Sequence, residues 1–122
     1  MFGIGSARTP RSKEVVTTSA EVLEAGCTVT FVARRSGSWV YLAGHETDDS
    51  EPLAVHFSHL AGVDPGLVTL RLRRCHYALR YDAGAPWHVF GPVEDDEMDR
   101  LLETGVVDAQ RADIVAGSGD DV

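Results

Sequence analysis

Cysteine is scarce in this sequence of 122 residues, which contains only Cys27 and Cys75. Small secreted domains held by disulfides use more cysteines, and a chain of this length can bury a core without them. We therefore expect two reduced thiols. No basic start leads into an apolar run, as in a secretory signal, and no apolar run approaches the ~20 residues that span a bilayer. The sequence therefore predicts a cytoplasmic protein without membrane association.

Basic residues are outnumbered, with 11 Lys and Arg against 19 Asp and Glu and a net charge of −8. This balance argues against nucleic acid as a partner, because phosphate neutralisation requires a clustered basic surface. The acids concentrate in two stretches, which are Glu46, Asp48, Asp49 and Glu51, and then Glu94–Glu97 with Asp99 and Glu103. Nine of the 11 bases lie in two groups, Arg8, Arg11 and Lys13 near the start, and Arg34, Arg35, Arg71, Arg73, Arg74 and Arg80 in the middle. Such acidic stretches suit a basic protein partner, although they are also consistent with solubility alone.

Signatures of catalysis are missing as well. There is no Gly-x-Ser-x-Gly elbow, and Gly3-Ile4-Gly5 follows no strand, unlike a phosphate-binding loop. Cys75 and His76 are adjacent, so in a strand their side chains would point to opposite faces and could not form a dyad. The sequence therefore predicts no enzyme, no catalytic residue and no cofactor.

Five histidines raise the question of a metal site. His56 and His59 have the spacing that shares a face on a helix, but paired cysteines at zinc-finger spacing do not occur. We predict no metal site. An alternative hypothesis is an enzyme or a small ligand- or metal-binding domain with His56, His59 and Cys75 in one pocket.

Alternation and turn residues predict the local structure. Strands are expected over residues 15–18, 28–34, 39–43, 53–57, 77–81 and 87–90, with a hairpin closed by Ser36-Gly37-Ser38. A short helix is expected over residues 65–71, started by Asp64-Pro65. A second helix is expected over residues 93–104, with acids in its first turns and a narrow buried stripe of Met98, Leu101 and Leu102 that packs on an edge. For residues 19–24 the sequence is consistent with either extended chain or a helical turn.

These elements indicate an α+β fold with a small, mostly antiparallel sheet and a few short helices. Residues 1–13 are predicted to form a flexible arm, residues 14–105 a single domain, and residues 106–122 a partly disordered tail.

The middle of the chain carries a longer pattern. It consists of Ser38-Trp39-Val40-Tyr41-Leu42-Ala43-Gly44-His45-Glu46-Thr47-Asp48-Asp49, then Val63-Asp64-Pro65-Gly66-Leu67, then Tyr77-Ala78-Leu79-Arg80 and Trp87. The pattern resembles the immunity-protein-thirty-three-like family of bacterial polymorphic toxin systems, formerly a domain of unknown function. The resemblance covers about residues 15–90. The chain departs from the family at Ser36-Gly37-Ser38-Trp39 and at Arg73-Arg74-Cys75, and the helix after Phe90 lies outside the pattern.

The resemblance implies an immunity protein that binds and neutralises a cognate protein toxin. A basic nuclease is the toxin class that best matches the charge of the chain. The acidic loop is then expected to contact the toxin, with two aromatic residues at its base. The predicted contact residues are Trp39, Tyr41, Glu46, Asp48, Asp49 and Glu51. A regulatory domain that binds another partner is the remaining alternative, and the oligomeric state is left open.

Overall fold

The structure is a computed structural model of the chain, and it describes residues 7–44, 46 and 50–104. Its centre is a six-stranded sheet with the strand order β4-β1-β3-β2-β5-β6. Neighbouring strands are antiparallel except β1 and β3, which run parallel. The strands are Val15–Ser19 (β1), Phe31–Arg34 (β2), Trp39–Leu42 (β3), Pro52–His56 (β4), His76–Leu79 (β5) and His88–Phe90 (β6). The predicted α+β fold with a mostly antiparallel sheet in one small domain is confirmed.

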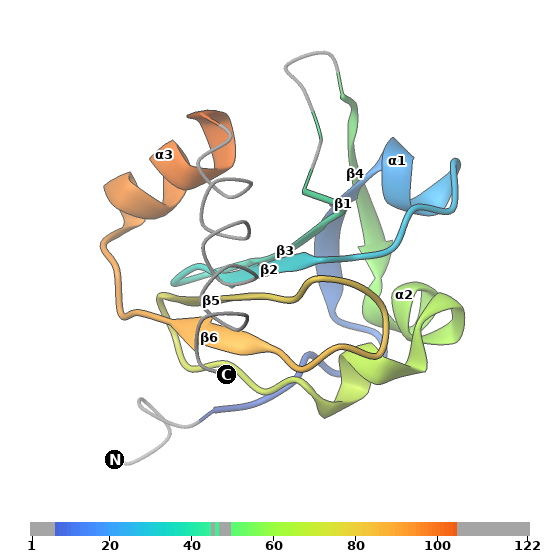
Figure 1. Cartoon of the computed structure of the whole chain (residues 1–122), viewed down its shortest axis with the longest axis horizontal. Coiled ribbons are helices and arrows are strands. Elements are labelled where there is room, and N and C mark those ends of the chain that lie inside the picture. Colours follow the sequence, from blue (N-terminus) through green and yellow to red (C-terminus); the bar gives the residue numbers. More distant parts are fainter. Residues whose placement is uncertain (1–6, 45, 47–49, 105–122) are drawn as a thin grey trace, which may run out of the picture.

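Three α-helices and one 3-10 helix surround the sheet within the described residues. They are Ala20–Leu23 (α1), Phe57–Val63 (α2), Pro65–Thr69 (the 3-10 helix η1) and Asp95–Thr104 (α3). Figure 1 shows α2 and α3 on opposite sides of strands β2 and β3. The molecule therefore has a helix layer on each side of its central strands.

Both faces of the central strands are buried, and each has its own apolar cluster. On the first face, Val32, Trp39 and Tyr41 pack with Phe57 and Leu60 of α2. The second face carries a cluster of Phe31, Ala33, Val40, Tyr77, Leu79, Met98 and Leu101. Strand side chains alternate between the faces, so a continuous run of apolar residues in β2 and β3 supplies both clusters.

The predicted apolar stripe of helix α3 is confirmed, but the helix packs on a different part of the sheet than predicted. Met98 and Leu101 are buried against the sheet face formed by residues of β2, β3 and β5, so α3 covers this face and does not pack on an edge. The helix begins at Asp95, two residues later than predicted. A chain reversal at Gly91 leads into it, where φ is +129° and a side chain would collide with the carbonyl oxygen of Cys75.

Helix α2 was not predicted, and the reason is its length. Phe57–Val63 is seven residues long and lacks a capping side chain at His56. So short a helix has no stability of its own and forms because Phe57 and Leu60 pack on the sheet. The helix predicted over residues 65–71 is the 3-10 helix η1, which ends at Thr69, and Asp64 caps it as expected by accepting from Gly66 N at 3.1 Å.

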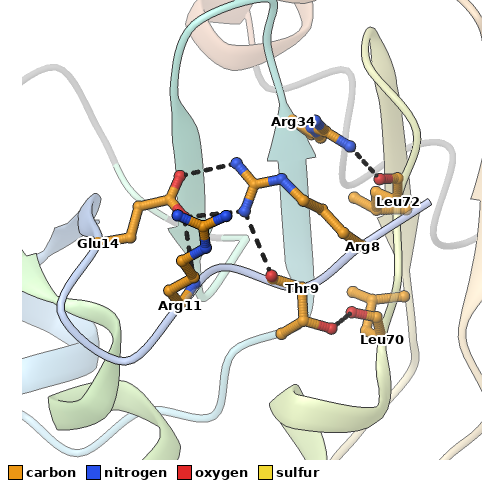
Figure 2. Close-up of polar contacts among 7 residues, drawn as sticks. All are labelled: Arg8, Thr9, Arg11, Glu14, Arg34, Leu70 and Leu72. Atoms are coloured by element: carbon orange, nitrogen blue, oxygen red, sulfur yellow. Dashed lines mark hydrogen bonds and ion pairs between the residues drawn. The ribbon is translucent and has the colours of Figure 1, made fainter. Parts of the chain in front are cut away.

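The N-terminal segment differs from the predicted flexible arm over residues 7–13. Backbone groups of Arg8 and Leu72 exchange hydrogen bonds of 3.1 and 3.0 Å, and the Thr9 hydroxyl donates to Leu70 O at 2.8 Å. Figure 2 shows this segment passing beside the chain at Leu70 and Leu72. The prediction failed here because the partners are some 60 residues away in sequence. Residues 1–6, the predicted cap at Gly105 and the tail 106–122 lie outside the described residues.

Candidate protein-binding site

Trp39 and Tyr41, two of the predicted contact residues, belong to the core. Their exposed fractions are 2% and 1%, and their rings lie 6.3 Å apart and nearly parallel. The Arg34 guanidinium lies 5.2 Å from the Trp39 ring centroid, and burial raises the pKa of the Tyr41 phenol. The prediction that these aromatic residues contact a partner is therefore wrong, because neither presents a surface to bind.

Glu46 has a structural role that the sequence did not indicate. Its carboxylate accepts hydrogen bonds from Ala43 N at 2.7 Å, Gly44 N at 2.8 Å and the Ser19 hydroxyl at 2.6 Å. Charge-assisted bonds of this kind are among the stronger ones in proteins. Glu46 therefore holds the end of β3 against the end of β1, and its oxygens are engaged within the chain.

The other predicted acids differ from one another in their surroundings. Glu51 is exposed at the start of β4, where its carbonyl accepts from Ala20 N at 3.2 Å. Its neighbour Ser50 donates to Glu21 at 2.5 Å, which ties this end of the loop to α1. Asp48 and Asp49 lie outside the described residues. Of the predicted contact residues that the structure describes, Glu51 is the one whose side chain is free to meet a partner.

A groove of about 420 Å³ runs between Glu51 and helix α3, on the sheet face that α3 covers. Its floor contains Thr17, Val40 and Leu42, and Leu102 of α3 lines one side. Glu46, Ser50, Glu51 and Pro52 lie on the other side. We call this surface the acid-rimmed groove. The acidic loop and the acidic helix, separate in sequence, therefore border one site.

Helix α3 brings its acids close to this groove. Glu94, Asp95, Asp96 and Glu97 are exposed. At a rise of about 1.5 Å per residue, residues 95–97 lie about 8 to 10 Å from Leu102 along the helix axis. This distance is about one Debye length at physiological salt, so the charges of these residues act on the groove mainly at low ionic strength.

The helix is fixed to the β2–β3 turn by two polar contacts. Arg35 forms an ion pair with Asp99 at 2.7 Å, and the Ser36 hydroxyl donates to Asp95 at 2.9 Å. Arg35 also lines the groove. The only described cation lining the groove is therefore already paired, which leaves the rim negative.

A buried polar cluster on the other sheet face was missed by the sequence analysis. Arg80 is 2% exposed, its guanidinium pairs with Asp64 and donates to Val29 O at 2.9 Å, and it lies 4.4 Å from the ring centroid of Trp87. Asp64, Arg80 and Trp87 all belong to the pattern that resembles the immunity family. These three residues of the pattern therefore hold η1, the end of β5 and the segment before β6 together.

The alternative pocket of His56, His59 and Cys75 does not form. The rings of His56 and His59 are 6.1 Å apart, next to edge strand β4. Cys75 precedes β5, which three strands separate from β4 in the sheet, and its φ of +66° places it in a turn. No group of three or more potential metal-ligating His, Cys, Asp or Glu side chains occurs among the described residues.

Comparisons with protein-family models, curated proteins and solved structures found no match to this chain. The family resemblance thus stays a prediction. Within residues 7–44, 46 and 50–104, no helix is long and apolar enough to cross a membrane.

Proposed function

We propose that this chain is an immunity-type binding protein that neutralises a basic protein toxin, and that the acid-rimmed groove is its contact surface. The resemblance of residues 15–90 to the immunity family gives the class of function. The observation that carries the proposal is the groove itself, in which an apolar floor lies beneath a negative rim. In this proposal the contact surface no longer includes the buried Trp39 and Tyr41. It includes surface residues of α3 and still includes the acidic loop.

The groove has the two components that a protein interface requires. Leu42 and Leu102, which are partly exposed, offer apolar area that a partner side chain can cover. Glu51 supplies a carboxylate at the rim, and the exposed acids at the start of α3 add negative charge to the same side of the sheet, where charge acts mainly on association rate and on partner choice. A basic side chain with a long apolar stem, Arg or Lys, would satisfy both components.

A basic nuclease fits this surface because its substrate groove must attract phosphate. A protein with a net charge of −8 and carboxylates around an apolar groove would compete for that groove. The mechanism is occlusion by binding, so the proposal assigns no catalytic residue and no cofactor. It places the protein in the cytoplasm, where a toxin-producing cell needs protection.

The function is tested by expressing the product of the neighbouring gene in a bacterial host, with and without this chain. We expect the neighbouring product to stop growth and this chain to restore it. The double variant Glu51→Lys/Leu102→Asp should lose the protection, because it reverses a rim charge and adds a charge to the apolar side of the groove. Glu24→Lys/Val63→Asp, which changes exposed residues outside the groove in the same way, should protect like the wild type.

Two results would overturn the proposal. One is a neighbouring product that is harmless or belongs to a metabolic pathway. The other is equal protection by the groove variant and the wild type at equal soluble expression, which would remove the groove from the contact surface.

A further inference from the structure

A second groove, of about 700 Å³, lies on the opposite side of the sheet from the acid-rimmed groove. The N-terminal segment forms one wall with Arg8, Thr9, Pro10 and Ser12. Helix α2 forms the other wall with Phe57, Ser58, Ala61 and Gly62, and Val68 and Arg71 close one end. Figure 2 shows Arg8, Thr9 and Arg11 on the N-terminal segment that borders this groove. We call it the basic groove.

The two acids that adjoin the segments around the basic groove are both paired, Glu14 with Arg8 and Asp64 with Arg80. Residues 7–13, 57–63 and 65–76 carry none of the 19 acids of the chain. Within these segments the exposed cations are Arg11, Lys13, Arg71, Arg73 and Arg74. None of the five forms an ion pair within the described part of the chain. This surface is therefore locally positive, although the protein as a whole has a net charge of −8.

The buried Arg34, which lies near this surface, is affected by the same concentration of positive charge. Burial, and then the positive charges of Arg8 and Arg74, lower the pKa of Arg34. The negative charge of Glu14 partly offsets this by raising the pKa of Arg34, and the same carboxylate accepts two hydrogen bonds from Arg8, at 2.9 and 3.0 Å. Further negative charge beside the exposed cations of these segments would be stabilised.

We infer that the basic groove binds an acidic peptide segment of a partner protein, one in which carboxylates alternate with apolar side chains. Arg71 in the groove lining, with the exposed Arg11, Lys13, Arg73 and Arg74 on the adjoining segments, supplies the positive charge that selects the carboxylates. The apolar part is supplied by Ala61 and by Val68, which is 49% exposed. The hydroxyls of Ser12 and Ser58 add polar groups suited to a peptide backbone.

A peptide fits this groove better than a nucleic acid does. Binding of single strands relies on exposed aromatic rings that stack with bases, whereas Phe57, the aromatic residue that lines the groove, is buried to 3% exposure. The net charge of −8 also opposes a long polyanion while leaving a short acidic segment attracted locally. This inference does not rest on the proposed toxin, because it concerns the other face of the sheet.

The test uses a fluorescein-labelled synthetic peptide, Asp-Leu-Glu-Val-Asp-Leu-Glu-Val, and anisotropy titration of the full chain at about 50 mM salt. We expect saturable binding that weakens about tenfold or more in Arg71→Glu/Arg73→Glu and when the peptide carries Asn and Gln in place of its acids. Gly62→Trp should also weaken binding. A Cβ atom added at Gly62 would meet no atom within 4 Å, so a larger side chain has room to leave the α2 backbone toward the groove that Gly62 lines. Glu51→Lys/Glu97→Lys, on the other face, should leave the peptide affinity undiminished.

Three results would overturn the inference. They are no saturable binding of the peptide by the full chain, an affinity that neither Arg71→Glu/Arg73→Glu nor Gly62→Trp reduces, and tighter binding of an oligothymidine of equal charge. The last result would assign the surface to nucleic acid. Circular dichroism and thermal melts of each variant establish that the fold is retained.

Discussion

At the scale of single residues, several charged side chains in this protein maintain its structure. Arg80 is buried with Asp64 beneath Trp87, and Glu46 caps two backbone N–H groups at the end of β3. Their sequence positions suggested ordinary exposed charge. Buried charged groups are retained only when paired and hydrogen-bonded, and that condition depends on residues distant in sequence. This explains why Glu46 was predicted as a contact residue and Arg80 was not singled out.

Glu14 gives a pH-dependent prediction at this scale. Its hydrogen bonds with Arg8 lower the pKa of the carboxyl from 4.5 to about 2. A lowered pKa stabilises the folded state above pH 4.5, and this stabilisation is lost as the pH falls through about 2. Glu14→Gln should therefore cost about 1 kcal/mol at pH 7, a modest value because the pair is partly exposed.

Urea denaturation of wild type and Glu14→Gln at a series of pH values measures this difference. The free energies of unfolding should differ at neutral pH and converge between pH 4.5 and about 2. A difference that is independent of pH would show that the ion pair is not the source of the stability.

At the scale of elements, the sequence was most informative where the signal was local. The β2–β3 hairpin was predicted from its alternation and its turn, and α3 from its acids and apolar stripe. Helix α2 and the attachment of residues 7–13 were not predicted, because packing on a distant strand and pairing with Leu72 create them. The location of α3 over the sheet also required tertiary information, since a stripe indicates burial but not the surface that buries it.

Helix α3 provides a second prediction, because it forms one side of the acid-rimmed groove and depends on few apolar contacts. Met98 is fully buried against the sheet face that also holds Phe31 and Tyr77. Met98→Ala should lower the free energy of unfolding by about 2 to 4 kcal/mol through the lost contacts and the cavity. Glu97→Ala, one residue earlier and exposed, should change it by less than about 0.5 kcal/mol.

Chemical denaturation followed by tryptophan fluorescence compares these two variants. Equal and small effects would mean that α3 does not pack on the sheet, and the acid-rimmed groove would then lose one of its sides.

At the scale of the whole molecule, charge divides the protein into two surfaces on opposite sides of one sheet. The acid-rimmed groove lies beside α3, and the basic groove lies between the N-terminal segment and α2. The charge composition of both surfaces could be predicted, since the acidic stretches and the arginine-rich middle are visible in the sequence. It could not indicate that the acidic loop and the acidic helix border the same groove, because β4, α2, η1, β5 and β6 separate them in sequence.

The central claim is that the acid-rimmed groove attracts a basic protein partner. The most direct test is the association rate constant with the neighbouring gene's product, measured by biosensor for wild type and Glu51→Lys/Glu97→Lys. Glu24→Lys/Asp82→Lys, which makes the same change in net charge outside the groove, is the matched control. We predict that the groove variant associates about tenfold more slowly at about 20 mM salt, that the control changes far less, and that the difference nearly vanishes at about 500 mM salt. Equal rates for the two variants at low salt would contradict the account.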